Sequence, residues 1–154
     1  MPSVRRTASP AFAGAVILLV VLLVACSSPA ASSAPLTVSG AWVRSVAIPN
    51  QPTAAYLTIS NGSGQSDALV GASSPDAASV ELHQTMTDAS GMTGMQAMDR
   101  LEVPPEGEVS LQPGGNHLMV MGLSHPLATG GRLELDLQFE HAGKVVVMAE
   151  VRDG

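Results

Sequence analysis

The stretch LELDLQFE, residues 133–140, decides the fold class of this chain. Its odd-numbered residues are apolar and its even-numbered residues are polar. A period of two places alternate side chains on opposite faces of a β-strand, so we expect one face on a core and the other in water. The sequence His141-Ala142-Gly143 then predicts a turn into a second strand over residues 144–151.

The same pattern extends over most of the chain before this stretch. Short apolar alternations are separated by clusters of Gly, Pro, Asn and Asp, and no segment shows a convincing helix of ordinary length. Many short strands with regular turns predict an antiparallel β-sandwich or barrel, an all-β fold. The predicted strands cover residues 41–46, 54–60, 68–72, 79–85, 95–103, 109–111, 117–121, 132–140 and 144–151.

Composition excludes several classes of function. The 154 residues suit one domain, and 45% of them are hydrophobic, which is enough for a packed core. Seven Lys and Arg residues against 13 Asp and Glu residues make a nucleic-acid binder implausible. A single cysteine excludes an intramolecular disulfide, and the sequence contains no G-x-S-x-G, P-loop or H-E-x-x-H motif. We therefore expect a protein that is not an enzyme.

The N-terminal region is typical of an export signal. Arg5 and Arg6 precede an uncharged stretch that reaches Ala25, and a small-residue run follows. The string Leu23-Val24-Ala25-Cys26 resembles a bacterial lipobox, which implies cleavage before Cys26 and its lipidation. An uncleaved membrane anchor is the alternative, although the apolar run is short for a spanning helix. Both interpretations place the rest outside the cytoplasm. We expect a signal peptide over 1–25, a flexible tether over 26–37 and a folded domain over 38–154.

Methionine is concentrated in one part of the chain, where six of the eight residues lie between Met86 and Met121. His117 and Met119 are two residues apart on a predicted strand, so they share a face, to which Met121 also belongs. His83 ends another predicted strand. Thioethers together with imidazoles suit Cu(I), whereas magnesium and calcium prefer oxygen ligands. These residues are therefore candidate metal ligands.

The plainer interpretation is that these side chains fill the core, since methionine often occupies irregular gaps. For His117 and Met119 the local sequence leaves both interpretations open. The polar, turn-bearing stretch 88–98 favours ligands, because methionine at a turn is poorly placed to fill a core. Met148, within an apolar strand, is expected in the core. His125 and His141, at turns, are expected in solvent.

The wider sequence resembles the PCuAC-type extracytoplasmic copper chaperones. The family pattern is a His, a Met twelve positions later and a His-x-Met twenty-two positions after that, and His83, Met95, His117 and Met119 match it. Four surrounding strings match too: GAWVR at 40–44, AAYLTISN at 54–61, VELH at 80–83 and PGGNHLMVMGL at 113–123. Gln84 stands where many members have a Met after the first His. The matched region runs from about Ser39 to Val151.

This resemblance implies a cupredoxin-like Greek-key fold that holds one Cu(I) through His83, Met95, His117 and Met119. It also implies copper delivery to a respiratory oxidase subunit or an assembly protein. We expect a monomer, attached to the membrane through Cys26, with no nucleic-acid partner. The remaining methionines of the region are candidate auxiliary ligands: Met86, Met92, Met98 and Met121.

Three other functions compete with a chaperone. A copper store or scavenger would need the same site. A methionine-rich interaction module would bind no metal. A blue-copper electron carrier needs a cysteine thiolate, and the only cysteine is Cys26, before the tether.

Overall fold

The computed structural model describes residues 36–154. The predicted signal peptide, Cys26 and residues 26–35 of the predicted tether lie outside the described residues. The first strand begins at Leu36, two residues before the start that the sequence predicted for the domain. Residues 36–154 contain no helix with the length and apolar character that a membrane crossing needs.

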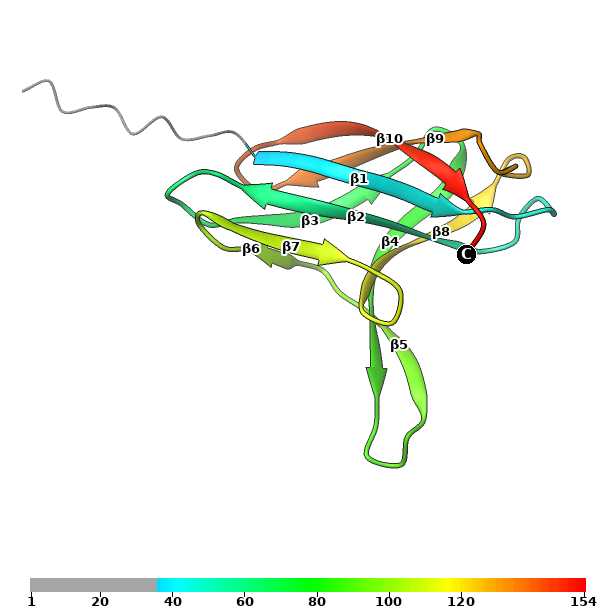
Figure 1. Ribbon diagram of the computed structural model, residues 1–154, viewed down its shortest axis with the longest axis horizontal. Coiled ribbons are helices and arrows are strands. Elements are labelled where there is room, and N and C mark those ends of the chain that lie inside the picture. Colours follow the sequence, from blue (N-terminus) through cyan, green and yellow to red (C-terminus); the bar gives the residue numbers. More distant parts are fainter. Residues whose placement is uncertain (1–35) are drawn as a thin grey trace, which may run out of the picture. The chain divides into compact units, whose positions relative to one another are not determined.

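The described residues form ten β-strands and no α-helix, which confirms the predicted all-β fold (Figure 1). The strands are β1 (Leu36–Arg44), β2 (Thr53–Asn61), β3 (Asp67–Ser73), β4 (Ala77–Thr87), β5 (Thr93–Ala97), β6 (Leu101–Val103), β7 (Gly107–Leu111), β8 (Asn116–Leu123), β9 (Arg132–Phe139) and β10 (Lys144–Arg152).

Seven of these strands close into a barrel in the order β4-β8-β2-β1-β10-β9-β3. The pairing of Ala72 with Val80 joins β3 to β4 and completes the ring. The other three strands are additions, since β5 pairs with β4, β6 with β3 and β7 with β2. Within residues 36–154 the pairings are antiparallel apart from that of β1 with β10, which is parallel.

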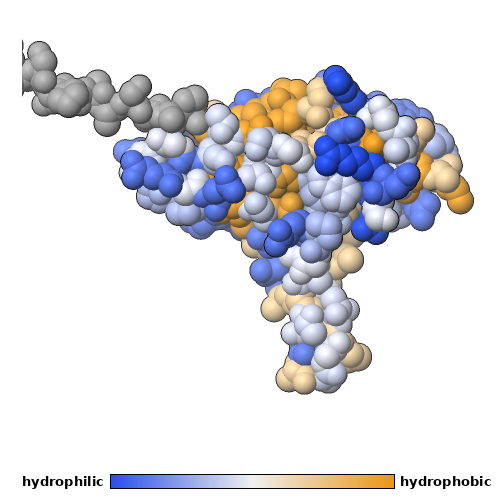
Figure 2. All heavy atoms as spheres, in the orientation of Figure 1, coloured by the Kyte–Doolittle hydropathy of each residue, from blue (hydrophilic) through white to orange (hydrophobic). Residues whose placement is uncertain are grey.

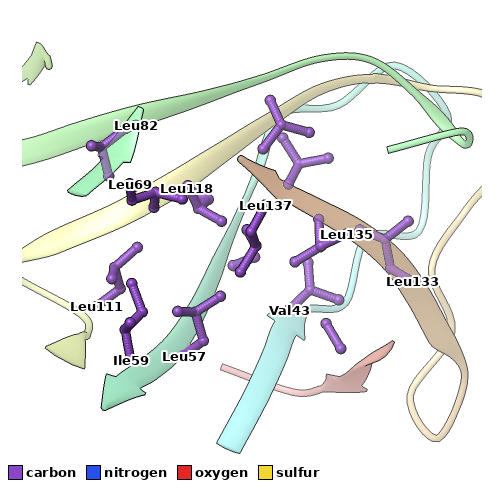
Figure 3. Close-up of a cluster of buried hydrophobic side chains, with 14 of the residues drawn as sticks. Val43, Leu57, Ile59, Leu69, Leu82, Leu111, Leu118, Leu133, Leu135 and Leu137 are labelled. Carbon is purple, nitrogen blue, oxygen red and sulfur yellow. The ribbon is translucent and has the colours of Figure 1, made fainter. Parts of the chain in front are cut away.

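The core lies inside this barrel, where leucines from many strands meet (Figure 3). The apolar residues of β9 are at most 1% exposed, as the alternation in LELDLQFE predicted. Leu118 and Val120 of β8 and Val80 and Leu82 of β4 also point inward and are buried. Burying one such side chain contributes about 1.5–3 kcal/mol. Because these residues alternate, their neighbours on β4 and β8 project from the outer face.

The structure corrects two predictions about strands. Residues 95–103, predicted as one strand, form β5 and β6 with a break at residues 98–100. The two halves pair with different partners, β4 and β3, and Arg100 in the break forms ion pairs with Glu102 and Glu140. The prediction that Met148 lies in the core is also wrong, because its side chain is 50% exposed. Because β10 is apolar on both sides, its sequence does not show which face is inward. Ala149 pairs with the buried Leu133 and therefore points inward, so the adjacent Met148 points outward.

The β4–β5 hairpin projects away from the barrel (Figure 1). The pairing of β4 with β8 ends at Gln84, so the rest of β4 continues as a two-stranded ribbon with β5. At the tip, the carboxylate of Asp88 accepts hydrogen bonds from the backbone N–H groups of Ser90 and Met92, both at 2.9 Å. Figure 2 shows that weakly hydrophilic and apolar residues cover most of this hairpin.

Candidate metal centre

The register between β4 and β8 brings two candidate ligands together. His83 pairs directly with His117, and Glu81 pairs with Met119. Directly paired residues of an antiparallel sheet point to the same face, so these four side chains gather on the outer face of the barrel. Leu82 and the other inward-pointing residues of β4 and β8 lie on the opposite face of these strands, in the core.

The register between β4 and β5 adds Met95 to the same face. Met95 pairs with Thr85, which is two residues beyond His83 and therefore shares its face. Met95 lies within a strand rather than at the turn, which spans only residues 88–92. The structure thus places His83, Met95, His117 and Met119 on one continuous face of β5, β4 and β8.

The two imidazole rings are close, and each has one nitrogen without a partner. Their centroids are 5.9 Å apart and their planes are inclined by 53°. Nδ1 of His117 lies 3.1 Å from the carbonyl oxygen of Gly115, and Nε2 of His83 lies 3.1 Å from a carboxylate oxygen of Glu81. Carbonyl and carboxylate oxygens only accept, so these two nitrogens carry the protons.

The opposite nitrogens, Nδ1 of His83 and Nε2 of His117, are consequently lone-pair acceptors. Both are buried and neither has a hydrogen-bond partner among the described residues. A buried, unpaired polar atom is costly and calls for an explanation, and a bound ligand supplies one. Donation of the other ring N–H to an oxygen is the usual arrangement around a metal-binding histidine. These two nitrogens are therefore the strongest indication of a metal site.

The sequence analysis did not identify Glu81. The spacing Glu-x-His on a strand could have indicated it, because residues two apart share a face and the carboxylate can reach the ring. Glu81 is half exposed, whereas the His83 side chain is only 16% exposed. The carboxylate therefore holds the ring of this candidate ligand from the solvent side.

The methionines give the site an open side. Met119 is half-buried and Met95 is 61% exposed. Both border a hollow of about 520 Å³, which His117 and Tyr56 also line. The imidazole of His117 is buried and the thioether of Met95 is exposed, so the site can be reached from solvent on the side of Met95.

The structure separates the candidate auxiliary methionines from these four. Met121 shares the outer face, as predicted, but it pairs with Ser79, four residues along β4 from His83. Met86 lies on the other face of the hairpin from Met95, and Met92 lies in the turn before β5; they are 51% and 70% exposed. Met98 packs against the barrel core.

The donor set is soft. Among residues 36–154, no three His, Cys, Asp or Glu side chains converge as a metal site would require. Two imidazoles and two thioethers remain, a combination that favours monovalent copper over magnesium or calcium. The two histidines expected in solvent, His125 and His141, are 51% and 66% exposed, which confirms that prediction.

Solved structures with a similar fold include PCuAC domains. The copper-bound PCuAC domain from PmoF2 is 26% identical, with a TM-score of 0.66, over 80% of this chain and 97% of that one. The solution structure of CuI-DR1885 from Deinococcus radiodurans is 38% identical, with a TM-score of 0.64, over 84% of this chain and 87% of that one. The fold is therefore the cupredoxin-like fold of the PCuAC type, as the sequence predicted.

Sequence comparison defines the family within this class. The family described as "Putative lipoprotein LpqE-like" matches residues 36–151, and the chain belongs to this LpqE-like family. "Putative lipoprotein Lxx21020" from Leifsonia xyli subsp. xyli (strain CTCB07) is 32% identical over 145 residues, 90% of this chain and 86% of the relative.

Proposed function

We propose that this protein is an extracytoplasmic copper chaperone, not an enzyme, that binds one Cu(I) through His83, Met95, His117 and Met119. The observation that carries the proposal is the pair of buried, unpartnered imidazole nitrogens beside two thioethers on the same face. Two similar structures, the copper-bound PCuAC domain from PmoF2 and CuI-DR1885, support copper as the cargo.

The openness of the site favours delivery over storage. Met95 is 61% exposed on a projecting hairpin, so an acceptor can approach it without unfolding the barrel. A store gains most from a closed cage, whereas a carrier needs a ligand that a partner can replace. We propose that the acceptor is a respiratory oxidase subunit or an assembly protein of its copper site.

We further propose that the chain acts on the outer side of the membrane, held there by lipidated Cys26. The lipoprotein descriptions of the LpqE-like family and of the Leifsonia relative support this location. Replacement of Cys26 by Ser should release the protein from membranes. Metabolic labelling with a fatty acid should mark the wild-type chain and leave Cys26→Ser unlabelled.

An anaerobic Cu(I) titration against a competing chelator tests the binding proposal. Residues 36–154 form a closed barrel with its own hydrophobic core, so this part is suitable for the experiment. Met119→Leu keeps size and apolarity but removes the thioether. We expect Met119→Leu and His117→Ala each to weaken binding at least tenfold, about 1.4 kcal/mol.

The matched control is Met148→Leu, an exposed methionine on β10 away from the site. Its Cu(I) affinity should equal that of the wild type. Loss of binding in Met148→Leu with retention in Met119→Leu would contradict the site. Oxidase copper content in a deletion strain under scarce copper then separates delivery from storage, because a store without a delivery role leaves that content unchanged.

A further inference from the structure

β5 is an unprotected edge of the sheet. Among the strands of residues 36–154 it lies at the end of the order and pairs only with β4. All five of its residues, Thr93–Ala97, are exposed, and none is charged or a proline. Proteins usually guard such an edge with charges, Pro, bulges or a covering segment. The opposite end of the order, β6, has three residues and carries Glu102 beside Arg100.

The ladder shows which backbone groups of β5 face outward. Met98 N–H donates to the carbonyl of Leu82 at 2.8 Å, and Asp88 N–H donates to the carbonyl of Met92 at 2.9 Å. Bonded and non-bonded pairs alternate in an antiparallel ladder, so the even-numbered residues between them also bond to β4. The N–H and C=O groups of Thr93, Met95 and Ala97 therefore point away from β4.

These outward groups belong to the residues that share the face of the metal centre. Thr93, Met95 and Ala97 pair with Thr87, Thr85 and His83 and project to the same side. In an antiparallel strand added at this edge, the residue opposite Met95 would have its Cα about 5.5 Å away. Its side chain would stand beside the Met95 thioether, on the copper face.

We propose that β5 is the docking edge for an extended, uncharged segment of the copper-accepting protein, which adds as an antiparallel strand with a soft donor opposite Met95. This inference rests on the proposed function and names how the acceptor binds. Backbone hydrogen bonds give such strand addition its affinity, and alternate side chains give it specificity. The continuity of this edge with the metal face identifies the acceptor as the occupant.

A blocked pentapeptide, acetyl-Thr-Val-Met-Val-Thr-amide, is the probe for this edge. We titrate it into the ¹⁵N-labelled apo domain, residues 36–154, and follow the backbone amide signals. The signals of Thr93, Met95 and Ala97 should shift most. A peptide N-methylated at its central Met loses a donor that faces β5 and should bind at least tenfold more weakly. A peptide N-methylated at the second residue loses a donor that faces away and should bind like the parent peptide.

A variant of the protein provides the complementary test. Thr93→Pro removes one outward donor at the ribbon end far from the histidines. Peptide affinity should fall at least tenfold, while the Cu(I) affinity measured without peptide stays within threefold of the wild type.

Three results would overturn the proposal: shifts centred outside β5, equal binding of the two N-methylated peptides, or concentration-dependent shifts at 93–97 without peptide. The last would assign the edge to a second copy of this chain. The apo titration needs no copper, so its failure can be told apart from failure of the proposed function, which the Cu(I) titration and the oxidase copper content test.

Discussion

At the scale of single residues, the two histidines of the site are held by different kinds of acceptor. The imidazole of His117 is fixed by a backbone carbonyl, that of Gly115, whereas the imidazole of His83 is fixed by the carboxylate of Glu81. Only the second acceptor can be changed by a substitution. Glu81 therefore offers direct experimental access to the orientation of one proposed ligand, His83.

Glu81→Gln keeps an oxygen acceptor and should retain Cu(I) affinity within about threefold, because the amide can still accept from Nε2 of His83. Glu81→Leu removes the acceptor and should weaken binding by about 10- to 100-fold. The chelator titration measures the affinities, and ¹⁵N spectra of the apo imidazoles report the protonated nitrogen. Unchanged affinity in Glu81→Leu would show that the contact does not orient the ligand.

Asp67 is a second carboxylate with a defined role, this time in stability. It is 5% exposed and accepts hydrogen bonds from the N–H groups of Ala68, His141 and Ala142 at 2.7–2.9 Å. Burial raises the pKa of Asp67, but these donors and the nearby His141 ring outweigh that effect and hold the pKa below its ordinary value. The carboxylate thus fastens the β9–β10 turn to β3.

Replacement of Asp67 by Asn should lower the free energy of unfolding by about 2 kcal/mol at pH 7, because the acceptor loses its charge. A depressed pKa stabilises the fold above the unfolded-state value of about 3.9, and this contribution is lost as pH falls through the lower folded-state value. Urea unfolding of both proteins at several pH values measures this. The difference between them should shrink below about pH 4, and a constant difference would exclude the charge as its origin.

At the scale of elements, β8 depends on a glycine. Gly122 has φ of +65°, and a Cβ there would lie 2.5 Å from the Cβ of Ala78 on β4. Gly130 has φ of +85° but open space where its Cβ would be. Alanine substitutions at these two glycines therefore separate the cost of a positive φ from the cost of crowding between β4 and β8.

Gly130→Ala should cost about 1 kcal/mol through its positive φ alone. Gly122→Ala adds overpacking between β4 and β8 and should cost about 2–4 kcal/mol in total. Urea unfolding followed by the fluorescence of Trp42, the only tryptophan, measures both. Equal losses of unfolding free energy in the two variants would show that β4 and β8 move apart easily. The face of these strands that carries the candidate ligands would then lack a rigid support.

The two faces of the β4–β5 hairpin predict which methionines contribute to Cu(I) binding. Met95→Leu should weaken Cu(I) binding at least tenfold, whereas the double substitution Met86→Leu and Met92→Leu should leave it within twofold, since Met86 points to the other face and Met92 lies in the turn beyond the ribbon. The same chelator titration measures all three proteins. If the double variant lost as much Cu(I) affinity as Met95→Leu, the proposal that copper binds on the face of the hairpin that carries Met95 would be contradicted.

These elements also show how far the sequence could lead. Strict alternation identified β9 and its buried face, because polar residues marked the other side. The apolar run of β10 carries no such mark, so the position of Met148 could not be predicted. The spacing of His117 and Met119 predicted their common face, but the approach of His83 and Met95 depends on strand register, which is a property of the folded sheet. The break between β5 and β6 likewise depends on a change of partner.

At the scale of the whole molecule, the parallel pair β1–β10 closes the barrel. Trp42, Val43 and Arg44 pair with residues 150–152, and Val43 and Val151 are buried where these strands meet. Without β10, both β1 and β9 would become edges and the core would open. Closure therefore depends on strands from the two ends of the described sequence.

A chain that ends at His141 should fail to unfold cooperatively in urea, because it lacks the whole of β10. A chain that ends at Arg152 retains β10 and should unfold in one transition. Near-ultraviolet circular dichroism and Trp42 fluorescence follow both. Cooperative unfolding of the shorter chain would show that the barrel does not require its closing strand.

The pairing of β1 with β10 also orders events in time. Ribosomes make β1 well before β10, the strand that pairs with it. Until β10 is made, β1 lacks one of its two neighbouring strands. Pairing between strands so far apart in the sequence is slow to form. A nascent chain therefore stays open until β10 is made, and a chain released before that point lacks the strand it needs to resist proteases.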